Sequence, residues 1–292
     1  MKSIYYTLLI LLSFTLNSQA QDLSSAANRF IESLDPELKK QACFPFDHTE
    51  RFNWHFVPRE RKGPTFHDFN TTQTKHALDL MRTSLGSVGQ EKAESIIELE
   101  NVLREVENRP ENDTYRDPLN YHFSIFGKPS SDKPWGWRLE GHHLSLNFSS
   151  TEGTITSATP SFMGSNPGIV LAGPQMNRQV LADETNIGFE LLHSLNDLQK
   201  KQVIFSDKAP ADIITSNARK AKILDQPGIK GDQLQPNQLA LLKKLVAVYL
   251  SRYTAAYQSK LLNRIEKSGW GNMSFAWAGS QTNEIGNPHY YS

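Results

Sequence analysis

The sequence predicts an α+β fold, in which an antiparallel sheet of short strands packs with several helices. Apolar residues recur at helical spacing toward both ends of the chain and alternate with polar residues in its middle. Glycine and proline separate the alternating runs, as is typical of hairpins. Because no internal repeat or low-complexity linker interrupts the pattern, we expect residues 21–292 to form a single α+β domain.

The first twenty residues predict a signal peptide for export. Lys2 supplies the positive start, residues 6–16 form an apolar run, and Ser18-Gln19-Ala20 offers the small side chains that a signal peptidase reads. We therefore expect residues 1–20 to be removed after Ala20 and the mature protein to be secreted or periplasmic. No later apolar run is long enough to predict stable membrane insertion after signal removal.

Helices are predicted on both sides of the central strands. Near the start, residues 23–46 have helical periodicity, with Asp35-Pro36 marking a turn or the start of a new helix. The aromatic segment that follows is expected to be a strand and a loop. The aromatic segment spans residues 51–63. Four further helices are predicted, the first of them capped by Thr71 or Thr72, at residues 70–85, 91–107, 183–206 and 236–267.

The middle of the chain predicts strands. Residues 121–126 alternate and end at Gly127, residues 137–148 form a second strand, and a turn at Glu152-Gly153 leads to a partner strand at 154–158. Residues 159–174 are rich in glycine and proline and predict a long ordered loop. Two short antiparallel strands are expected in the last segment, within MSFAWAG and at His289-Tyr290-Tyr291.

Charge and cysteine content exclude several classes of protein. Lys plus Arg and Asp plus Glu both number 31, so no overall field attracts nucleic acid and we expect no nucleic-acid partner. Cys43 is the only cysteine, which rules out an internal disulfide. Its apolar neighbours predict a buried, inert thiol rather than a nucleophile.

The segment WGWRLEGHHLSLNF places several ionisable groups in a strand that otherwise looks buried. Strand alternation puts Arg138, Glu140 and His142 on one face and His143 on the other. Burying such groups is costly unless they are paired or coordinate something. If the cluster has only a structural role, Arg138 and Glu140 pair with each other and the histidines are hydrogen-bonded in the interior.

The functional interpretation is a metal site for a hydrolytic reaction. His142, His143 and the distant His289 would hold a divalent metal ion, zinc or copper. Glu140 would be a ligand or the general base for a metal-activated water, and Arg138 would hold an anionic group. In a regular strand His142 is the stronger candidate, and His143 reaches the same site only if the strand is bulged or twisted.

These motifs resemble an exported bacterial family catalogued as domain of unknown function 3500. The resemblance rests on FGKP, WGWRLEGHHLSLNF, TPSFMGSNP, WHFVPRERKG and FAWAG…HYY, and it covers nearly the whole mature chain. It implies no particular activity. The matching motif positions are Glu140, His142, His143, His289, Trp54, Pro58, Arg61 and Gly63. Family members continue past the Tyr-Tyr pair, so we expect this chain to be C-terminally truncated relative to the family.

Two functions follow as hypotheses. The first is an exported metal-dependent hydrolase that uses the His/Glu cluster. The alternative is a non-catalytic periplasmic protein that binds a small-molecule, carbohydrate or peptide ligand through exposed aromatic side chains. Those aromatic candidates are Trp54, Trp135, Trp137 and Tyr290. Converging histidines would favour the enzyme, whereas scattered histidines and tryptophans lining a cleft would favour binding.

Overall fold

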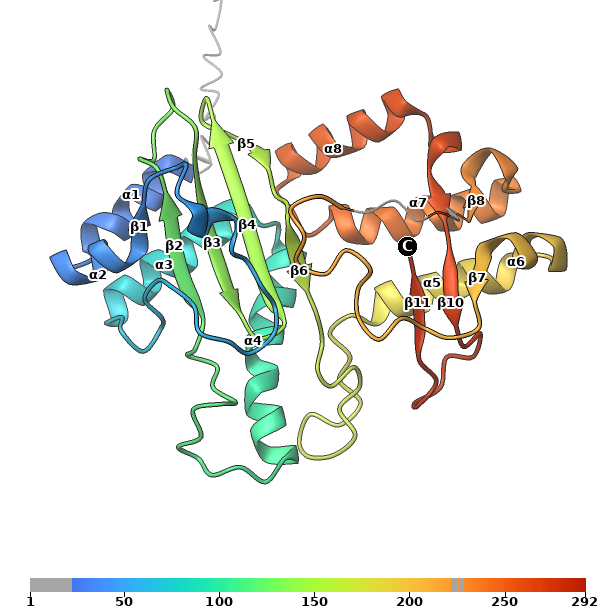
Figure 1. The fold of residues 1–292 in the computed structure, drawn as a ribbon, viewed down its shortest axis with the longest axis horizontal. Helices are drawn as coiled ribbons and strands as arrows, with labels where there is room; N and C mark the ends of the chain where they lie inside the picture. The colour runs from blue at the N-terminus through green and yellow to red at the C-terminus, as the bar shows by residue number, and fades with distance from the viewer. Residues whose placement is uncertain (1–22, 222–224, 226–227) are drawn as a thin grey trace, which may run out of the picture.

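The structure is a computed structural model that describes residues 23–221, 225 and 228–292. The predicted signal peptide lies outside the described residues. The elements before residue 170 surround one large sheet, and the elements after residue 180 lie beside it around smaller sheets (Figure 1). The predicted α+β class is confirmed.

The first group of elements contains four helices and the large sheet. Its helical elements are α1 (Leu23–Ser33), α2 (Pro36–Ala42), the 3-10 turn η1 (Thr49–Phe52), α3 (Thr71–Ser84) and α4 (Ser87–Val106). Its strands are β1 (Cys43–Phe44), β2 (His122–Phe126), β3 (Trp135–Gly141), β4 (Leu144–Thr151), β5 (Thr154–Ser157) and β6 (Ser161–Met163). The strand order is β1-β2-β3-β4-β5, with β6 also pairing with β4, and every pairing is antiparallel except that of β1 with β2.

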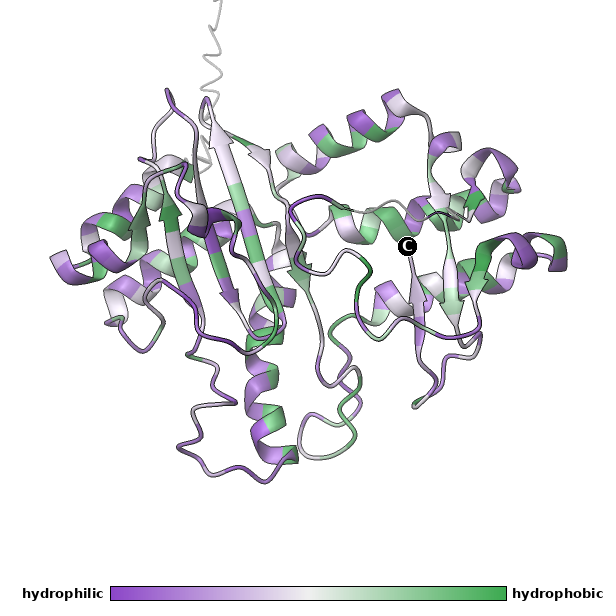
Figure 2. Ribbon diagram, in the orientation of Figure 1, coloured by the Kyte–Doolittle hydropathy of each residue, from purple (hydrophilic) through white to green (hydrophobic). Residues whose placement is uncertain are grey.

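Both faces of this sheet are covered, which explains why all of β3 is buried. On one face Trp137, Leu139 and their neighbours pack against α1, α3 and α4 in the main hydrophobic core. On the other face polar residues of β3 and β4 lie under the segment that runs from η1 to Gly63. Figure 2 shows the resulting alternation of apolar and polar residues along β4. The polar residues of β3 therefore point into an enclosed layer instead of solvent.

The second group of elements forms its own hydrophobic cluster, to which α5, α7, β9 and β10 all contribute. Its helical elements are α5 (Ala182–Ser194), α6 (Asp197–Val203), η2 (Gly231–Gln233), α7 (Pro236–Leu250), α8 (Ala255–Ser268) and η3 (Trp270–Asn272). Its strands are β7 (Ile204–Ser206), β8 (Ile229–Lys230), β9 (Ser274–Phe275), β10 (Trp277–Gly279) and β11 (His289–Tyr291). No helix in the described part of the chain is long and apolar enough to cross a membrane.

Several predicted elements are confirmed and others need correction. The helix start at Asp35-Pro36, the turn at Glu152-Gly153 and the antiparallel pair at the C-terminal end are all present. The helix predicted at 70–85 is capped by Asn70, whose side chain accepts from Gln73 N, rather than by a threonine. The expected helix at 91–107 already begins at Ser87.

The remaining corrections concern breaks that the sequence pattern does not reveal. The expected helix 183–206 divides into α5, α6 and β7, because Asn196 begins a new capping box. The expected helix 236–267 divides into α7 and α8 around residues 251–254, where Tyr253 bridges to Leu85. The predicted strand in residues 51–63 is absent, and the segment is irregular after η1. The loop predicted at 159–174 contains the short strand β6.

Candidate functional site

The two adjacent histidines lie in a hairpin turn, not in a strand. β3 ends at Gly141 and β4 begins at Leu144, and these two residues pair in register. His142 and His143 are the two residues between them, and His143 has a φ of 56°. The prediction that one strand runs through residues 137–148 is therefore wrong. The turn brings the two imidazoles together, with ring centroids 4.3 Å apart.

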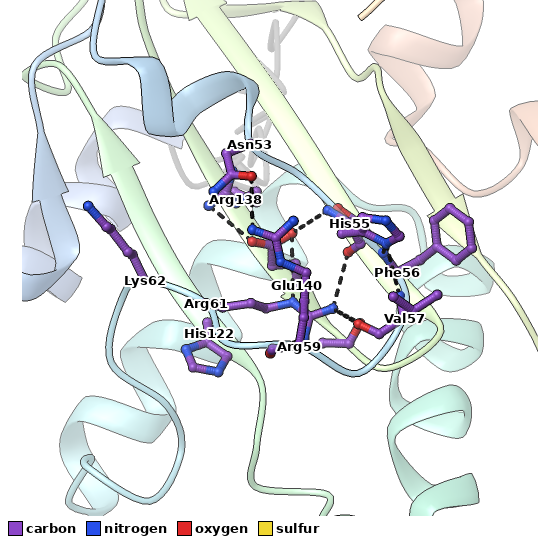
Figure 3. A network of polar contacts seen from close by, with 12 residues as sticks. Asn53, His55, Phe56, Val57, Arg59, Arg61, Lys62, His122, Arg138 and Glu140 are labelled. Atoms are coloured by element: carbon purple, nitrogen blue, oxygen red, sulfur yellow. Dashed lines mark hydrogen bonds and ion pairs between the residues drawn. The ribbon is translucent and has the colours of Figure 1, made fainter. Parts of the chain in front are cut away.

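Arg138 and Glu140 belong to a buried ion-pair network, shown in Figure 3. Arg138 Nη2 lies 3.0 Å from Glu140 Oε1 and 2.6 Å from Glu50 Oε1. Glu140 Oε2 accepts from His55 N at 2.9 Å and lies 3.9 Å from Arg61 Nε. Burial raises the pKa of Glu140, while the positive charge of Arg138 opposes that rise. Arg138 and Glu140 thus pair with each other, as the alternative without a catalytic role predicts. They also bind residues 50–61, which cover this face of the sheet.

His142 instead bonds a carboxylate from a helix. Its Nδ1 forms a hydrogen bond with Oε1 of Glu100, which projects from α4. Glu100 is 2% exposed, and its buried Oε2 has no hydrogen-bond partner among the residues that the structure describes. A buried carboxylate with a single partner is costly, so the arrangement is the kind more often retained for function than for stability. The other ring nitrogen, Nε2, lies 3.5 Å from Arg116 Nη1.

Further groups hold the turn in place. Tyr121 Oη donates to the His142 carbonyl at 2.9 Å, and burial raises the pKa of Tyr121 well above its usual value. Gly141 makes this contact possible, because a Cβ there would lie 2.4 Å from the Tyr121 ring. Arg116 Nη1 lies 3.3 Å from Nδ1 and 3.5 Å from Nε2 of His142. Hydrogen bonds from Arg116 and then Arg109 hold the pKa of Glu107, the carboxylate that pairs with Arg116, at about 2.

His142, Glu100 and Tyr121 line a cavity of ≈ 310 Å³. Its lining residues are Pro58, Arg59, Arg61, Glu100, Thr114, Tyr115, Asp117, Asn120, Tyr121 and His142. Arg61 is fixed by Glu140 and by the carbonyls of Val57 and Gly141, at 2.6 and 3.1 Å. Arg59 is exposed and forms no ion pair within the described part of the chain, where Asn53 Oδ1 accepts from it at 2.9 Å. Arg59 is thus the cavity-lining arginine that is available to pair with an anionic ligand.

His143 has surroundings quite different from those of its neighbour. Its backbone N donates to Phe56 O at 2.8 Å, and its carbonyl accepts from Gly164 N at 2.8 Å. Its Nδ1 is buried and has no hydrogen-bond partner in the described part of the chain. Burial lowers the pKa of His143 to about 4, with smaller effects from His142 and Arg116. The side chain is therefore neutral at physiological pH.

The structure brings some of the predicted site residues together and separates others. His142 and His143 are adjacent, whereas His289 lies in β11, where its ring stacks on Trp277 at 5.4 Å and contacts Phe189. Arg138 and Glu140 are each 1% exposed, and neither lines the cavity. Within residues 23–221, 225 and 228–292, no group of three or more His, Cys, Asp or Glu side chains could hold a metal ion. The metal and catalytic roles given to these residues stay predictions.

Three residues of the site are not among those that the sequence predicts: Glu100, Arg116 and Arg59. Glu100 occupies the apolar face of a predicted helix, between the buried Leu99 and Leu103. A carboxylate on such a face is the one signal that could have been found. Arg116 and Arg59 lie in irregular segments, where no periodicity indicates what a side chain faces.

The fold and the site define an α+β protein with an arginine-lined cavity at a hairpin turn. The comparisons with known proteins agree with the motifs that the sequence contains. The family model described as "Protein of unknown function (DUF3500)" matches residues 17–292, so the chain belongs to that family. No curated protein and no solved structure matches the chain.

Proposed function

We propose that the protein is a hydrolase that cleaves a small, negatively charged substrate in the cavity at His142. The observation that carries this proposal is the bond between Glu100, which is almost fully buried, and His142, which lines the cavity. A carboxylate that orients an imidazole and stabilises its protonated form is a recurring arrangement for general-base catalysis. The candidate base partner is thus Glu100 instead of Glu140.

The step is the attack of water on an acyl carbon. His142 Nε2 takes a proton from the water as its oxygen forms a bond to that carbon. The imidazolium then gives the proton to the leaving oxygen or nitrogen as the bond from the carbon to the leaving group breaks. Arg116 Nη1 lies beside the imidazole without lining the cavity, so its role is to hold the ring of His142 in place. Arg59 holds the anionic group of the substrate.

The test is turnover of a panel of chromogenic esters and anilides, each made with and without a carboxylate on the acyl side. We expect Arg59→Gln to raise KM for the carboxylate-bearing compounds and to leave the neutral ones unchanged. A His193→Gln variant, which alters an exposed histidine of α5, serves as the matched control. The proposal fails if no compound on the panel is turned over, or if Arg59→Gln affects charged and neutral compounds alike.

Zinc or copper bound by His142 and His143 is a separate proposal, supported by the 4.3 Å between the two rings. It is tested by metal analysis of protein purified without a His-tag. Stoichiometric metal that is lost in His142→Gln but kept in His193→Gln would support it. A metal content that is the same in both variants would contradict it.

A further inference from the structure

A second cavity, of ≈ 160 Å³, lies between residues 51–54 and strands β3 and β4. Its lining residues are Arg51, Phe52, Trp54, Phe126, Trp137, Asn147, Phe148, Ser149, Thr159, Pro160 and Arg219. An engineered apolar cavity of about 150 Å³ holds benzene, so this space suits one six-membered ring. Of the aromatic residues proposed for ligand binding, Trp54 and Trp137 are present here. The expectation that they are exposed is wrong, because Trp54, Trp135 and Trp137 are 4%, 0% and 1% exposed.

Two guanidinium groups border this aromatic cavity. Arg219 lies over the Phe52 ring at 3.7 Å, and Arg51 lies over the Phe46 ring at 4.0 Å while donating to Ser149 Oγ at 3.0 Å. Neither arginine forms an ion pair with any residue that the structure describes. Burial lowers the pKa of Arg51, and the charge of Arg219 lowers it further. Stacked arginines keep their N–H edges available, and an anion between these two would relieve their repulsion.

The same cavity offers a hydrogen-bond acceptor. Asn147 donates from Nδ2 to Ser145 Oγ at 3.1 Å and to Pro160 O at 2.9 Å, which fixes its amide plane. Its Oδ1 receives no hydrogen bond from the described residues. A fixed, unused acceptor fits a ligand hydroxyl and has no role toward a purely aromatic acid. Trp54 Nε1 is likewise buried without a partner.

We infer that this second cavity binds one ring of an acidic sugar, a hexuronate. The apolar face of the ring packs against Trp54, the carboxylate bonds Arg51 and Arg219, and a hydroxyl donates to Asn147. This site is distinct from the cavity at His142, and its ligand is bound without any bond being broken. Its occupancy is therefore independent of the proposed hydrolysis.

Titration calorimetry with D-glucuronate, D-galacturonate, D-glucose and benzoate tests the inference on the full-length mature protein. We expect at least one hexuronate to bind with a 1:1 stoichiometry and more tightly than both glucose and benzoate. Arg219→Gln should weaken hexuronate binding by about 10-fold or more, the effect of losing a charge-assisted hydrogen bond. Arg219 is exposed, so this variant should keep the wild-type fold.

Two comparisons keep the outcome unambiguous. Arg264→Gln, at an exposed arginine of α8, should bind hexuronate like the wild type. Asn147→Leu should weaken hexuronate and leave benzoate unchanged. Benzoate binding as tightly as a hexuronate would overturn the sugar assignment. The absence of hexuronate binding, or binding equal in Arg219→Gln and Arg264→Gln, would overturn the site itself.

Discussion

Glu100 and His142 form the pair on which the proposed chemistry depends. Glu100 is buried on an otherwise apolar face of α4; one oxygen bonds His142, and the other bonds none of the described residues. Removing a carboxylate from water costs several kcal/mol, which one hydrogen bond repays only in part. We interpret the burial of Glu100 as serving a function, because its carboxylate holds the His142 imidazole in one tautomer at the cavity wall.

Glu100→Gln separates orientation of the base from substrate binding. We expect kcat on a substrate found in the chromogenic panel to fall by about 10-fold or more while KM stays within about 2-fold, because the amide cannot stabilise the imidazolium. Glu91→Gln, on an exposed position of the same helix, should behave like the wild type. A loss confined to KM would contradict the assigned role of Glu100.

His143 should make stability depend on pH. The unfolded chain binds a proton at this histidine near its ordinary pKa of 6.5, whereas the folded chain does so only near 4. Above pH 6.5 this histidine is neutral in both states and does not change the free energy of unfolding. As the pH falls from 6.5 toward 4, the unfolded chain takes up the proton first, and the free energy of unfolding decreases by on the order of 2 kcal/mol.

His143→Asn isolates that dependence, because asparagine tolerates the positive φ and does not titrate. Urea unfolding from pH 7 to pH 4 should show a smaller loss of stability for the variant than for the wild type. Equal losses in the two proteins would show that other groups dominate acid unfolding.

The strands around the β3–β4 hairpin could be predicted from the sequence, but the hairpin turn itself could not. Alternation along residues 121–126 and 154–158 predicted β2 and β5 well, because each lies next to a glycine-containing turn. Gly141-His142-His143-Leu144 contains none of the Asn-Gly or Asp-Gly signals of two-residue turns, so the sequence predicts a strand that continues through these residues. The turn forms because histidine tolerates a left-handed conformation and Tyr121 holds its backbone.

The partners of the site residues could not be predicted for a related reason. Arg138 and Glu140 share a strand face two residues apart, which allows either the catalytic roles predicted for them or a mutual ion pair, and in the structure they do pair. Their other partners come from residues 50–61, and the partner of His142 comes from α4. Strand periodicity fixes which face a side chain takes, but only the tertiary fold fixes what lies opposite.

Gly141→Ala tests the packing of this hairpin. The added Cβ would lie 2.4 Å from the Tyr121 ring, so the ring must move and its bond to the His142 carbonyl weakens. We expect a loss of about 1–3 kcal/mol in the free energy of unfolding. In Gly168→Ala a Cβ would meet nothing within 4 Å, and chemical denaturation should show little change. Equal stability of the two variants would contradict the packing described.

The two groups of elements are joined by a buried ion-pair cluster. Glu184 of α5 accepts from Lys92 of α4 at 2.5 Å and from Arg252 at 2.6 Å. Gly86 N also donates to Arg252 O at 3.0 Å, and Tyr291 Oη donates to Glu184 O at 3.0 Å. The contacts of Lys92 with Glu184 and of Gly86 with Arg252 cross between the two groups, so we expect both groups to unfold in one transition.

Glu184→Gln should weaken that connection. Removing one partner of a buried pair leaves Lys92 and Arg252 uncompensated, which typically costs about 3–5 kcal/mol. Glu190→Gln, also on α5, removes a half-exposed pair with Lys244 of α7 and should cost at most about 1 kcal/mol. Thermal unfolding followed by circular dichroism and by tryptophan fluorescence measures both effects. A similar small change in the two variants would show that the cluster does not join the two groups.

The comparison of kcat/KM between the wild type, His142→Gln and His193→Gln bears most directly on the proposed hydrolase. Using the best carboxylate-bearing substrate of the chromogenic panel, we expect His142→Gln to lose about 10²- to 10⁴-fold, the contribution of a general base. His193→Gln should retain the wild-type value. Equal kcat/KM in all three proteins would contradict the assignment of His142 as the general base.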